Sequence, residues 1–291
     1  MKPAPFAYFA PRSLAEALSI MAELGDEAKL LAGGQSLVPA MNFRLVQPAA
    51  LVDLNQVAEL DYIRAHGDGS VAIGAMTRQR RLERDGEIGR RLPLLRSVMA
   101  HIAHPQIRNR GTLGGSLAHA DPAAELPAVM LALDASLRLA NRRRQREVAA
   151  ADFFLGVFST ELEADEVLLE VTVPPADGRM GWEFIEFARR HGDYALLGLV
   201  ALLKLDDAGQ VATARLVYLN AGEAPLDAAQ AASSLIGQRP DKAAFRQAAE
   251  IAVADEIRPT ASIHASVEYL RHLGQVLTVR ALTAAAVRAA A

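Results

Sequence analysis

Hydrophobic residues recur on one helical face over residues 14–24, and the string Ser13-Leu14-Ala15-Glu16 at the start has the spacing of a capping box. This pattern predicts a helix that ends at Gly25. Short apolar runs between turn residues are typical of buried strands. Such runs follow at residues 29–32, 51–54 and 71–74. The first part of the chain is therefore predicted to mix helices and strands.

Longer apolar stretches in the middle of the chain predict helices again. Residues 92–101 have an amphipathic pattern, and residues 123–133 are almost wholly apolar. We expect a buried helix over the second stretch, with Asp121 as its N-cap and Pro122 at its first position. A charged turn then separates two apolar segments, which is typical of a hairpin. The strands predicted here are residues 137–140, 147–149 and 167–173.

The last part of the chain follows a run of turn residues at 176–179, which we interpret as a linker. A buried strand or helix at residues 194–205 and an alternating strand at residues 211–220 come next and indicate a meander. Ser262 or Thr260 is expected to cap the final helix. The helices predicted after the meander are residues 228–235, 242–254 and 262–290. Strands followed by helices favour an α+β fold class.

The composition narrows the function classes. The chain has 31 basic and 34 acidic residues, and this net charge of −3 argues against nucleic acid as the main partner. It has no cysteine, which excludes disulfides, cysteine-ligated zinc, thiolate catalysis and ordinary iron–sulfur ligation by this chain. The longest apolar run, residues 194–203, has about half the length of a membrane span. We therefore expect a soluble, cytoplasmic protein with no membrane span.

Two double glycines, Gly33-Gly34 and Gly114-Gly115, are candidate anion sites. Each follows apolar sequence and precedes small or hydroxyl residues, so each can turn tightly and direct backbone N–H groups toward a phosphate. Together they can hold a diphosphate with uncharged donors, while a purely structural turn stays the alternative for either. Neither loop has the spacing of a P-loop or a Rossmann fingerprint, which argues against nucleoside-triphosphate chemistry and a Rossmann nicotinamide site.

Histidines and serines give weaker hypotheses. A two-histidine, one-carboxylate metal site could draw its ligands from His101, His104, His119 and Asp121, but the pattern is unspecific and we expect no metal ligand in this chain. Ser36 and Ser116 lack the Gly-x-Ser-x-Gly elbow that positions a hydrolase nucleophile. No residue is predicted to be catalytic as an acid, base or nucleophile.

Longer strings around the glycines carry a specific pattern. They are residues 31–39 (LAGGQSLVP), 51–55 (LVDLN), 73–78 (IGAMTR) and 107–127 (IRNRGTLGGSLAHADPAAELP). With them the chain resembles the FAD-binding medium subunits of molybdenum hydroxylases, a family that includes the flavoproteins of xanthine dehydrogenase and carbon monoxide dehydrogenase. Further matches extend the resemblance over nearly the whole chain, at residues 152–154, 189–195 and 264–266.

The resemblance implies a fold and a domain order. It implies a two-subdomain FAD-binding domain of the PCMH/VAO type over residues 1–176, with subdomains at about 1–55 and 56–176. A C-terminal α+β domain of the CO dehydrogenase flavoprotein type, with an antiparallel sheet and helices, is expected over residues 177–291.

The resemblance also implies which residues hold FAD. Main-chain groups of the two loops bind the diphosphate in that family, and the matching residues here are Ala32, Gly33, Gly34, Gln35, Ser36, Leu37, Gly111, Thr112, Gly114, Gly115 and Ser116. Glu125 matches an acidic residue near the ribose and flavin, and Asp121 either contacts FAD or only caps the helix. Ile102 and Leu168 match residues that pack on the cofactor, and Tyr194 matches an aromatic residue near the isoalloxazine. Ordinary core packing is the alternative for the last three.

The function implied by the resemblance is electron transfer. FAD in this chain would accept electrons from 2Fe-2S clusters of a small partner subunit and pass them to a terminal acceptor, while a large subunit carries the molybdenum cofactor, in a dimer of heterotrimers. Ile185 and Glu186 stand where the family often has a basic residue, so no cationic contact to the flavin is expected there. The alternatives are a stand-alone FAD oxidase or dehydrogenase and a non-catalytic module that binds a phosphate ligand or a protein.

Overall fold

The computed structural model, which describes residues 2–291, contains two compact units whose segments alternate along the chain. The first unit consists of Met1–Arg91, His104–Ala120 and Asp134–Pro175, and the second of Leu92–Ala103, Asp121–Leu133 and Ala176–Ala291. Met1, which the predicted first domain includes, lies outside the described residues. Because each unit collects separated segments, the continuous domains at residues 1–176 and 177–291 stay a prediction.

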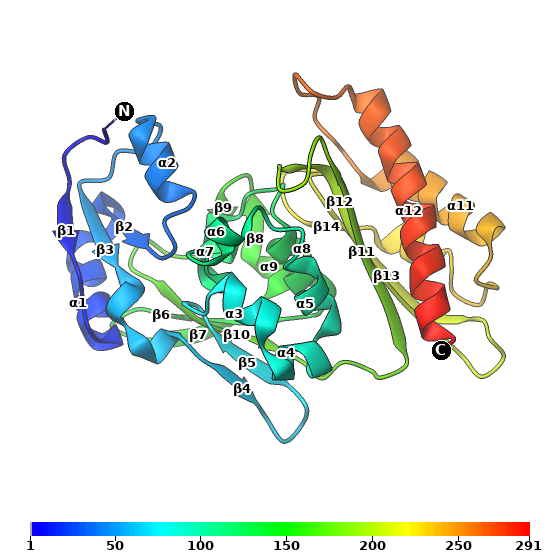
Figure 1. Cartoon of the computed structure of the whole chain (residues 1–291), viewed down its shortest axis with the longest axis horizontal. Coiled ribbons are helices and arrows are strands. Elements are labelled where there is room, and N and C mark those ends of the chain that lie inside the picture. The colour runs from blue at the N-terminus through cyan, green and yellow to red at the C-terminus, as the bar shows by residue number, and fades with distance from the viewer. Residues whose placement is uncertain (1) are drawn as a thin grey trace. The chain divides into compact units, whose positions relative to one another are not determined.

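The first unit begins with a small parallel sheet (Figure 1). Its strands, in spatial order, are β1 (Ala7–Phe9), β3 (Ala50–Asp53) and β2 (Ala28–Leu31). Helix α1 (Leu14–Leu24) buries Ala17 and Met21 against this sheet. The Ser13 side chain accepts a hydrogen bond from the Glu16 N–H at 3.2 Å, which confirms the predicted helix and its N-terminal cap.

A five-stranded antiparallel sheet forms the larger part of the first unit. Its strands, in spatial order, are β4 (Ile63–Ala65), β5 (Val71–Gly74), β10 (Val167–Val173), β6 (Ser136–Ala140) and β7 (Gln145–Ala149). The predicted strands and the hairpin with its charged turn are confirmed. The central strand β10 is buried over nearly its whole length and pairs with β5 along one edge and with β6 along the other.

Short elements complete the first unit. They are α2 (Leu37–Asn42), α3 (Gln79–Arg84), α4 (Gly86–Arg91), α6 (Pro105–Arg108), α7 (Leu113–His119), α9 (Ala150–Phe153), β8 (Phe154–Gly156) and β9 (Ser159–Thr160). Leu113 and Leu117 of α7 are fully buried, and this helix packs against β10. The packing fixes the position of the second double glycine, because Gly114 and Gly115 lie in the first turn of α7.

An antiparallel meander organises the second unit. Its strands are β11 (Met180–Ala188), β12 (Ala195–Leu205), β13 (Val211–Leu219) and β14 (Leu226–Asp227). The helices are α5 (Pro93–Val98), α8 (Glu125–Ala132), α10 (Ala229–Ser233), α11 (Lys242–Ile251) and α12 (Val267–Ala289). Figure 1 shows α12 along one face of the sheet and α5 and α8 along the other, so side chains of β12 are buried on both faces.

Two predicted helix starts are wrong. Helix α8 begins at Glu125 with Ala124 as its N-cap, and Asp121 instead accepts a hydrogen bond from the Ala123 N–H at 2.9 Å. Pro122 stays outside this helix because its carbonyl accepts the Asn220 N–H at 2.7 Å.

The final helix also starts later than predicted. Ser266 caps α12 by accepting the Tyr269 N–H at 3.2 Å, whereas Ser262 accepts the His264 N–H within a turn. Helix α5 is likewise shorter than its predicted stretch and ends at Val98. Over residues 2–291, no helix combines the length and the apolar character that crossing a membrane requires.

Candidate functional site

The first glycine loop, residues 32–37, connects β2 to α2 and is here named the first loop. Gly34 has a φ of 73°, a backbone conformation that favours glycine. The Val38 N–H donates to the Gly34 carbonyl at 3.2 Å and closes the turn. Within residues 2–291, the backbone N–H groups from Gly33 to Ser36 donate no hydrogen bond. Successive free N–H groups in a turn form a concavity that suits a phosphate.

The second glycine loop, residues 111–116 and here named the second loop, uses its donors differently. The Leu113 N–H donates to the Thr77 carbonyl at 3.0 Å, and the Gly114 N–H donates to the Ala75 carbonyl at 2.8 Å. The Gly115 N–H donates to the Thr112 hydroxyl at 3.0 Å. These bonds hold the loop rigidly in place, but they leave it fewer free backbone donors than the first loop.

The two loops, together named the loop pair, lie in direct contact. A Cβ on Gly33 would lie 2.5 Å from the Arg110 carbonyl oxygen and 2.8 Å from the Gly111 Cα. A Cβ on Gly115 would lie 3.2 Å from the Ala32 Cβ. Only glycine allows this approach, and the resulting cradle of neutral donors fits a diphosphate group.

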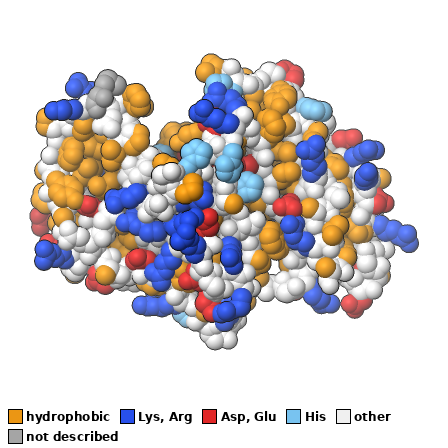
Figure 2. All heavy atoms as spheres, viewed as in Figure 1, with side chains coloured by type: hydrophobic (Ala, Val, Ile, Leu, Met, Phe, Trp, Pro, Cys, Tyr) orange, Lys and Arg blue, Asp and Glu red, His pale blue; other side chains and the backbone are white. Residues whose placement is uncertain are grey.

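Basic side chains surround the same part of the first unit. Figure 2 shows Lys and Arg side chains gathered over the region where Figure 1 places α3. The sequence there is Arg78-Gln79-Arg80-Arg81, and ion pairs join Arg80 to Glu83 at 2.6 Å and Arg81 to Asp61 at 2.8 Å. Such a concentration of positive charge attracts anionic ligands over a distance.

A cluster of titratable side chains, Glu125, Glu186 and His101, lies in the second unit and is here named the acid cluster. Glu125, in the first turn of α8, is only 9% exposed. Burial raises the pKa of Glu125 to about 8, and the nearby Glu186 and Asp121 add to the shift. Glu186 Oε1 lies 3.4 Å from His101 Nδ1, while Glu186 Oε2 is buried and has no hydrogen-bond partner among residues 2–291.

Glu186 was missed as a functional candidate in the sequence. Alternation along β11 places it on the same face as the buried Phe184, two residues earlier. The His101 ring packs edge-on against Phe184, with 4.9 Å between ring centroids. This period-two pattern is the only signal that could have linked Glu186 to the interior.

Tyr194 immediately precedes β12 and is 65% exposed, so it is not a core residue. Partial burial nevertheless raises its pKa, and the carboxylates of Asp121, Glu125 and Asp193 contribute in the same direction. An exposed ring can stack against a planar ligand. The predicted flavin contacts of Tyr194, Asp121 and Glu125 stay predictions.

Ile102 and Leu168 are both buried, at 7% and 5% exposure. Leu168 pairs with Leu139 of β6, next to an irregularity in the strand ladder. Their predicted contacts with the cofactor also stay predictions. Within residues 2–291, no three His, Asp or Glu side chains gather as metal ligands.

Comparison with known families and proteins identifies the fold and the family. Residues 4–176 match the FAD binding domain in molybdopterin dehydrogenase, and residues 182–285 match the CO dehydrogenase flavoprotein C-terminal domain. The chain is 41% identical over 289 residues to the 6-hydroxypseudooxynicotine dehydrogenase complex subunit alpha of Paenarthrobacter nicotinovorans, covering 99% of this chain and 97% of the relative.

Two further proteins show the same full-length similarity. The carbon monoxide dehydrogenase medium chain of Hydrogenophaga pseudoflava is 37% identical over 290 residues, which cover 100% of both chains. A chain in the crystal structure of quinoline 2-oxidoreductase from Pseudomonas putida 86 is 40% identical, with a TM-score of 0.95 and 99% of both chains covered.

The fold and the two matched domains thus define an FAD-binding subunit of an oxidoreductase. The chain belongs to the family of FAD-binding medium subunits of molybdenum hydroxylase complexes, of the carbon monoxide dehydrogenase and xanthine dehydrogenase type. The predicted family, mixed fold class and FAD cofactor are confirmed.

Proposed function

We propose that this chain is the electron-transfer subunit of its complex: it takes electrons from 2Fe-2S clusters in a small partner subunit and passes them to a terminal acceptor. The observation that carries the proposal is the first loop, whose free N–H groups from Gly33 to Ser36 lie against the rigid second loop. FAD, when bound, supplies a ring system that takes up and releases electrons singly or in pairs. The chain's own residues bind and orient that group.

The loop pair is the proposed holder of the diphosphate. The first loop donates from Gly33 to Ser36, and the second loop, from Gly111 to Ser116, supports it by contact. Ala32 and Leu37 complete the first loop. Neutral donors suffice because the neighbouring arginines supply attraction without entering either loop. Contacts to the remaining parts of FAD are proposed for Ile102, Asp121, Glu125, Leu168 and Tyr194.

The absence of cysteine from this chain supports partner chains that carry the iron–sulfur clusters. Because the chain contains no cysteine, such clusters need ligands from another chain. The relatives described above are a "complex subunit" and a "medium chain", which supports a multi-subunit assembly. We propose a small subunit with the clusters and a large subunit with the molybdenum cofactor. Assembly as a dimer of heterotrimers and a cytoplasmic location stay predictions from the sequence.

The first test is the visible spectrum of the purified chain, followed by heat release of its ligand and identification by mass. We expect flavin absorbance and about one FAD per chain, as for a site with a single diphosphate cradle. A colourless protein that does not bind added FAD would contradict the proposed loop site.

The second test separates an electron-transfer subunit from a stand-alone oxidase. The tagged chain, purified from cells that express its neighbours, should bring with it a cysteine-rich iron–sulfur chain and a large molybdenum chain. Substrate turnover by the chain alone, without either partner, would contradict the subunit proposal.

A further inference from the structure

Asn55 and Arg78 join the two loops through a short series of hydrogen bonds, all within the first unit. The Asn55 amide donates through Nδ2 to the Ala32 carbonyl, at the start of the first loop, at 2.9 Å. The Arg78 guanidinium donates through Nη2 to Asn55 Oδ1 at 2.5 Å and through Nη1 to the Arg110 carbonyl at 2.5 Å. Arg110 directly precedes the second loop. Asn55 and Arg78 are here named the brace.

The backbone around Arg78 is held against the second loop. It lies between β5 and α3 and forms an isolated antiparallel bridge with Thr112 of the second loop. The next residue, Gln79, donates its N–H to the Gly111 carbonyl at 2.9 Å. Burial and the neighbouring Arg110 lower the pKa of Arg78, but a guanidinium stays protonated at neutral pH. The brace therefore brings one fixed positive charge to the edge of the loop pair.

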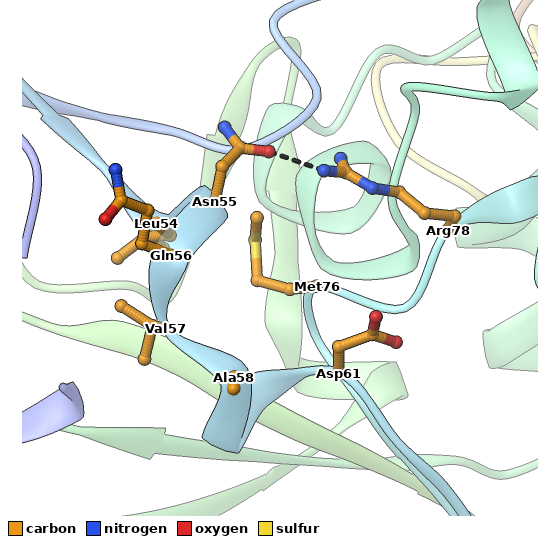
Figure 3. A pocket seen from close by; sticks show the side chains of 8 residues that line it. All are labelled: Leu54, Asn55, Gln56, Val57, Ala58, Asp61, Met76 and Arg78. Atoms are coloured by element: carbon orange, nitrogen blue, oxygen red, sulfur yellow. Dashed lines mark hydrogen bonds between the residues drawn. The ribbon is translucent and has the colours of Figure 1, made fainter. Parts of the chain in front are cut away.

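Hydrogen bonds, more than packing, determine where the Arg78 side chain lies. Figure 3 shows Arg78 reaching toward Asn55 along one side of a cavity of about 250 Å³. The side chains that line this cavity are Leu54, Asn55, Gln56, Val57, Ala58, Asp61, Met76 and Arg78. A guanidinium that lost its two acceptors would have free space beside it. The Asn55 side chain is in turn held by the Asp53 carboxylate, which also accepts the Asn55 N–H at 2.9 Å.

We propose that Asn55 and Arg78 are positioning residues for FAD, which hold the Ala32 end of the first loop at the spacing where its free N–H groups converge on the diphosphate. This inference rests on the proposed role of the loop pair. The glycine contacts keep the loops touching, whereas the brace sets the direction of the Ala32 carbonyl and so the orientation of the N–H groups that follow it. Neither brace residue needs to touch the cofactor.

Two variants test the brace in the full-length, flavin-free chain. Arg78→Gln breaks the links to both loops. Asn55→Asp keeps an acceptor for Arg78, removes the donor to the Ala32 carbonyl and to the Asp53 carboxylate, and adds a negative charge beside Asp53. We expect Arg78→Gln to weaken the affinity for FAD and for ADP by about 10- to 100-fold, since each charged hydrogen bond of this kind is worth that range. Asn55→Asp should weaken both by about tenfold.

Matched controls separate positioning from charge and from stability. Arg81→Gln removes a nearby charge whose ion pair with Asp61 does not involve either loop, and it should change the affinity less than twofold. Arg78→Lys keeps the charge but cannot donate toward both acceptors at once, so it should behave like Arg78→Gln. Hydrogen exchange at residues 32–37 should become faster in Arg78→Gln and Asn55→Asp, with melting temperatures close to that of the wild type.

Several outcomes would overturn the brace. Affinities within twofold of wild type in Arg78→Gln and Asn55→Asp, or full restoration by Arg78→Lys, would show that positioning is not its role. An equal loss in Arg81→Gln would assign the effect to general charge. If Arg78→Gln does not fold, Asn55→Asp and Arg78→Lys decide the question. A wild-type chain that binds neither FAD nor ADP would overturn the proposed loop site itself, and the brace's role with it.

Discussion

The loop pair and the acid cluster are both polar, but they are made of different chemical groups. The loop pair consists of backbone groups and glycines, and residues 32–37 and 111–116 contain no titratable side chain. The acid cluster consists of titratable side chains, and Glu186 keeps a buried oxygen without a partner. Ligand binding at the loop pair should therefore be sensitive to added side-chain volume and insensitive to pH. The contribution of the acid cluster to stability should instead depend on pH.

A buried glutamate of the first unit sharpens the contrast. Glu166 has a fully buried side chain, yet Arg146 donates to both its oxygens, at 2.8 and 2.7 Å, and the Glu163 N–H donates at 3.0 Å. Burial acts to raise the pKa of Glu166, but these donors outweigh it and hold the pKa below its ordinary value. Among residues 2–291 no such cation pairs with Glu125, so burial is the main cause of its raised pKa. Whether a buried carboxyl group is ionised therefore depends on whether a cation and N–H donors contact it, and not on burial alone.

Added volume in the loop pair should have the largest effect. In Gly33→Ala, the new methyl group meets the Arg110 carbonyl oxygen and the Gly111 Cα, which are backbone atoms and cannot rotate away. The loops must separate, and we expect the affinity for FAD to fall by about 100-fold. Flavin fluorescence titration of the full-length chain measures this loss.

The control for that variant is another glycine of the same unit. Gly86 opens α4 and has open space where a Cβ would lie, so Gly86→Ala should leave FAD affinity unchanged. Equal affinities in Gly33→Ala and wild type would mean that the contact between the loops is not needed for binding.

Removing the charge of Glu166 should lower stability next most strongly. Glu166→Gln leaves the partly buried Arg146 with only the more exposed Glu161 as a counter-charge, and we expect the free energy of unfolding to fall by about 2.5 kcal/mol. The wild-type contribution is present above the ordinary carboxyl pKa and is lost as pH falls through the lowered one. Urea denaturation at pH 7 and pH 3 checks both statements. A variant as stable as wild type at pH 7 would contradict the importance of the pair.

The acid cluster should give the opposite pH dependence. Because the pKa of Glu125 is raised to about 8 in the folded chain, the folded state keeps a proton that the unfolded chain releases above its ordinary pKa of 4.5. The destabilising effect of Glu125 is therefore absent at low pH and grows as pH rises, by about 2 kcal/mol between pH 6 and pH 8. Glu186, Asp121 and Tyr194 are the titratable groups that interact with Glu125, and His101 lies beside Glu186.

Two variants check this pH dependence. The glutamine side chain of Glu125→Gln is uncharged at every pH. The decrease in the free energy of unfolding between pH 6 and pH 8 that Glu125 causes should therefore be absent from the urea denaturation of this variant. Glu147→Gln, on the exposed side of β7, should keep the wild-type profile. Equal profiles in wild type and Glu125→Gln over this window would contradict the raised pKa of Glu125.

Local patterns predicted most of the secondary structure because the buried strands are short and bounded by turn residues. Strands Val71–Gly74 and Val167–Val173 have their predicted bounds. The start of α8 could not be predicted, since Asp121-Pro122 suits an N-cap and a turn equally well. The choice depends on the hydrogen bond from Asn220 to Pro122, which joins residues far apart in the sequence.

The same limit applies to the functional residues. The glycines of the loop pair are visible in the sequence, because tight turns need them locally. The brace is not visible: Asn55 and Arg78 are 23 positions apart, and Arg78 and Arg110 are 32 apart. Glu186 likewise becomes part of the acid cluster only because the folded strand β11 places it near His101 and Glu125. Such side chains can be assigned only once the fold is known.

The smallest effect is expected for Thr112, and it tests whether the two loops use their backbone donors differently. The buried Thr112 hydroxyl accepts the Gly115 N–H, so Thr112→Ala should lower the free energy of unfolding by about 1 kcal/mol, and Thr112→Ser should restore it. If the second loop only supports the first, the affinity of Thr112→Ala for FAD should stay within threefold of wild type. A change above tenfold at unchanged stability would instead assign the Gly115 donor to the diphosphate, and the two loops would then bind it in the same way.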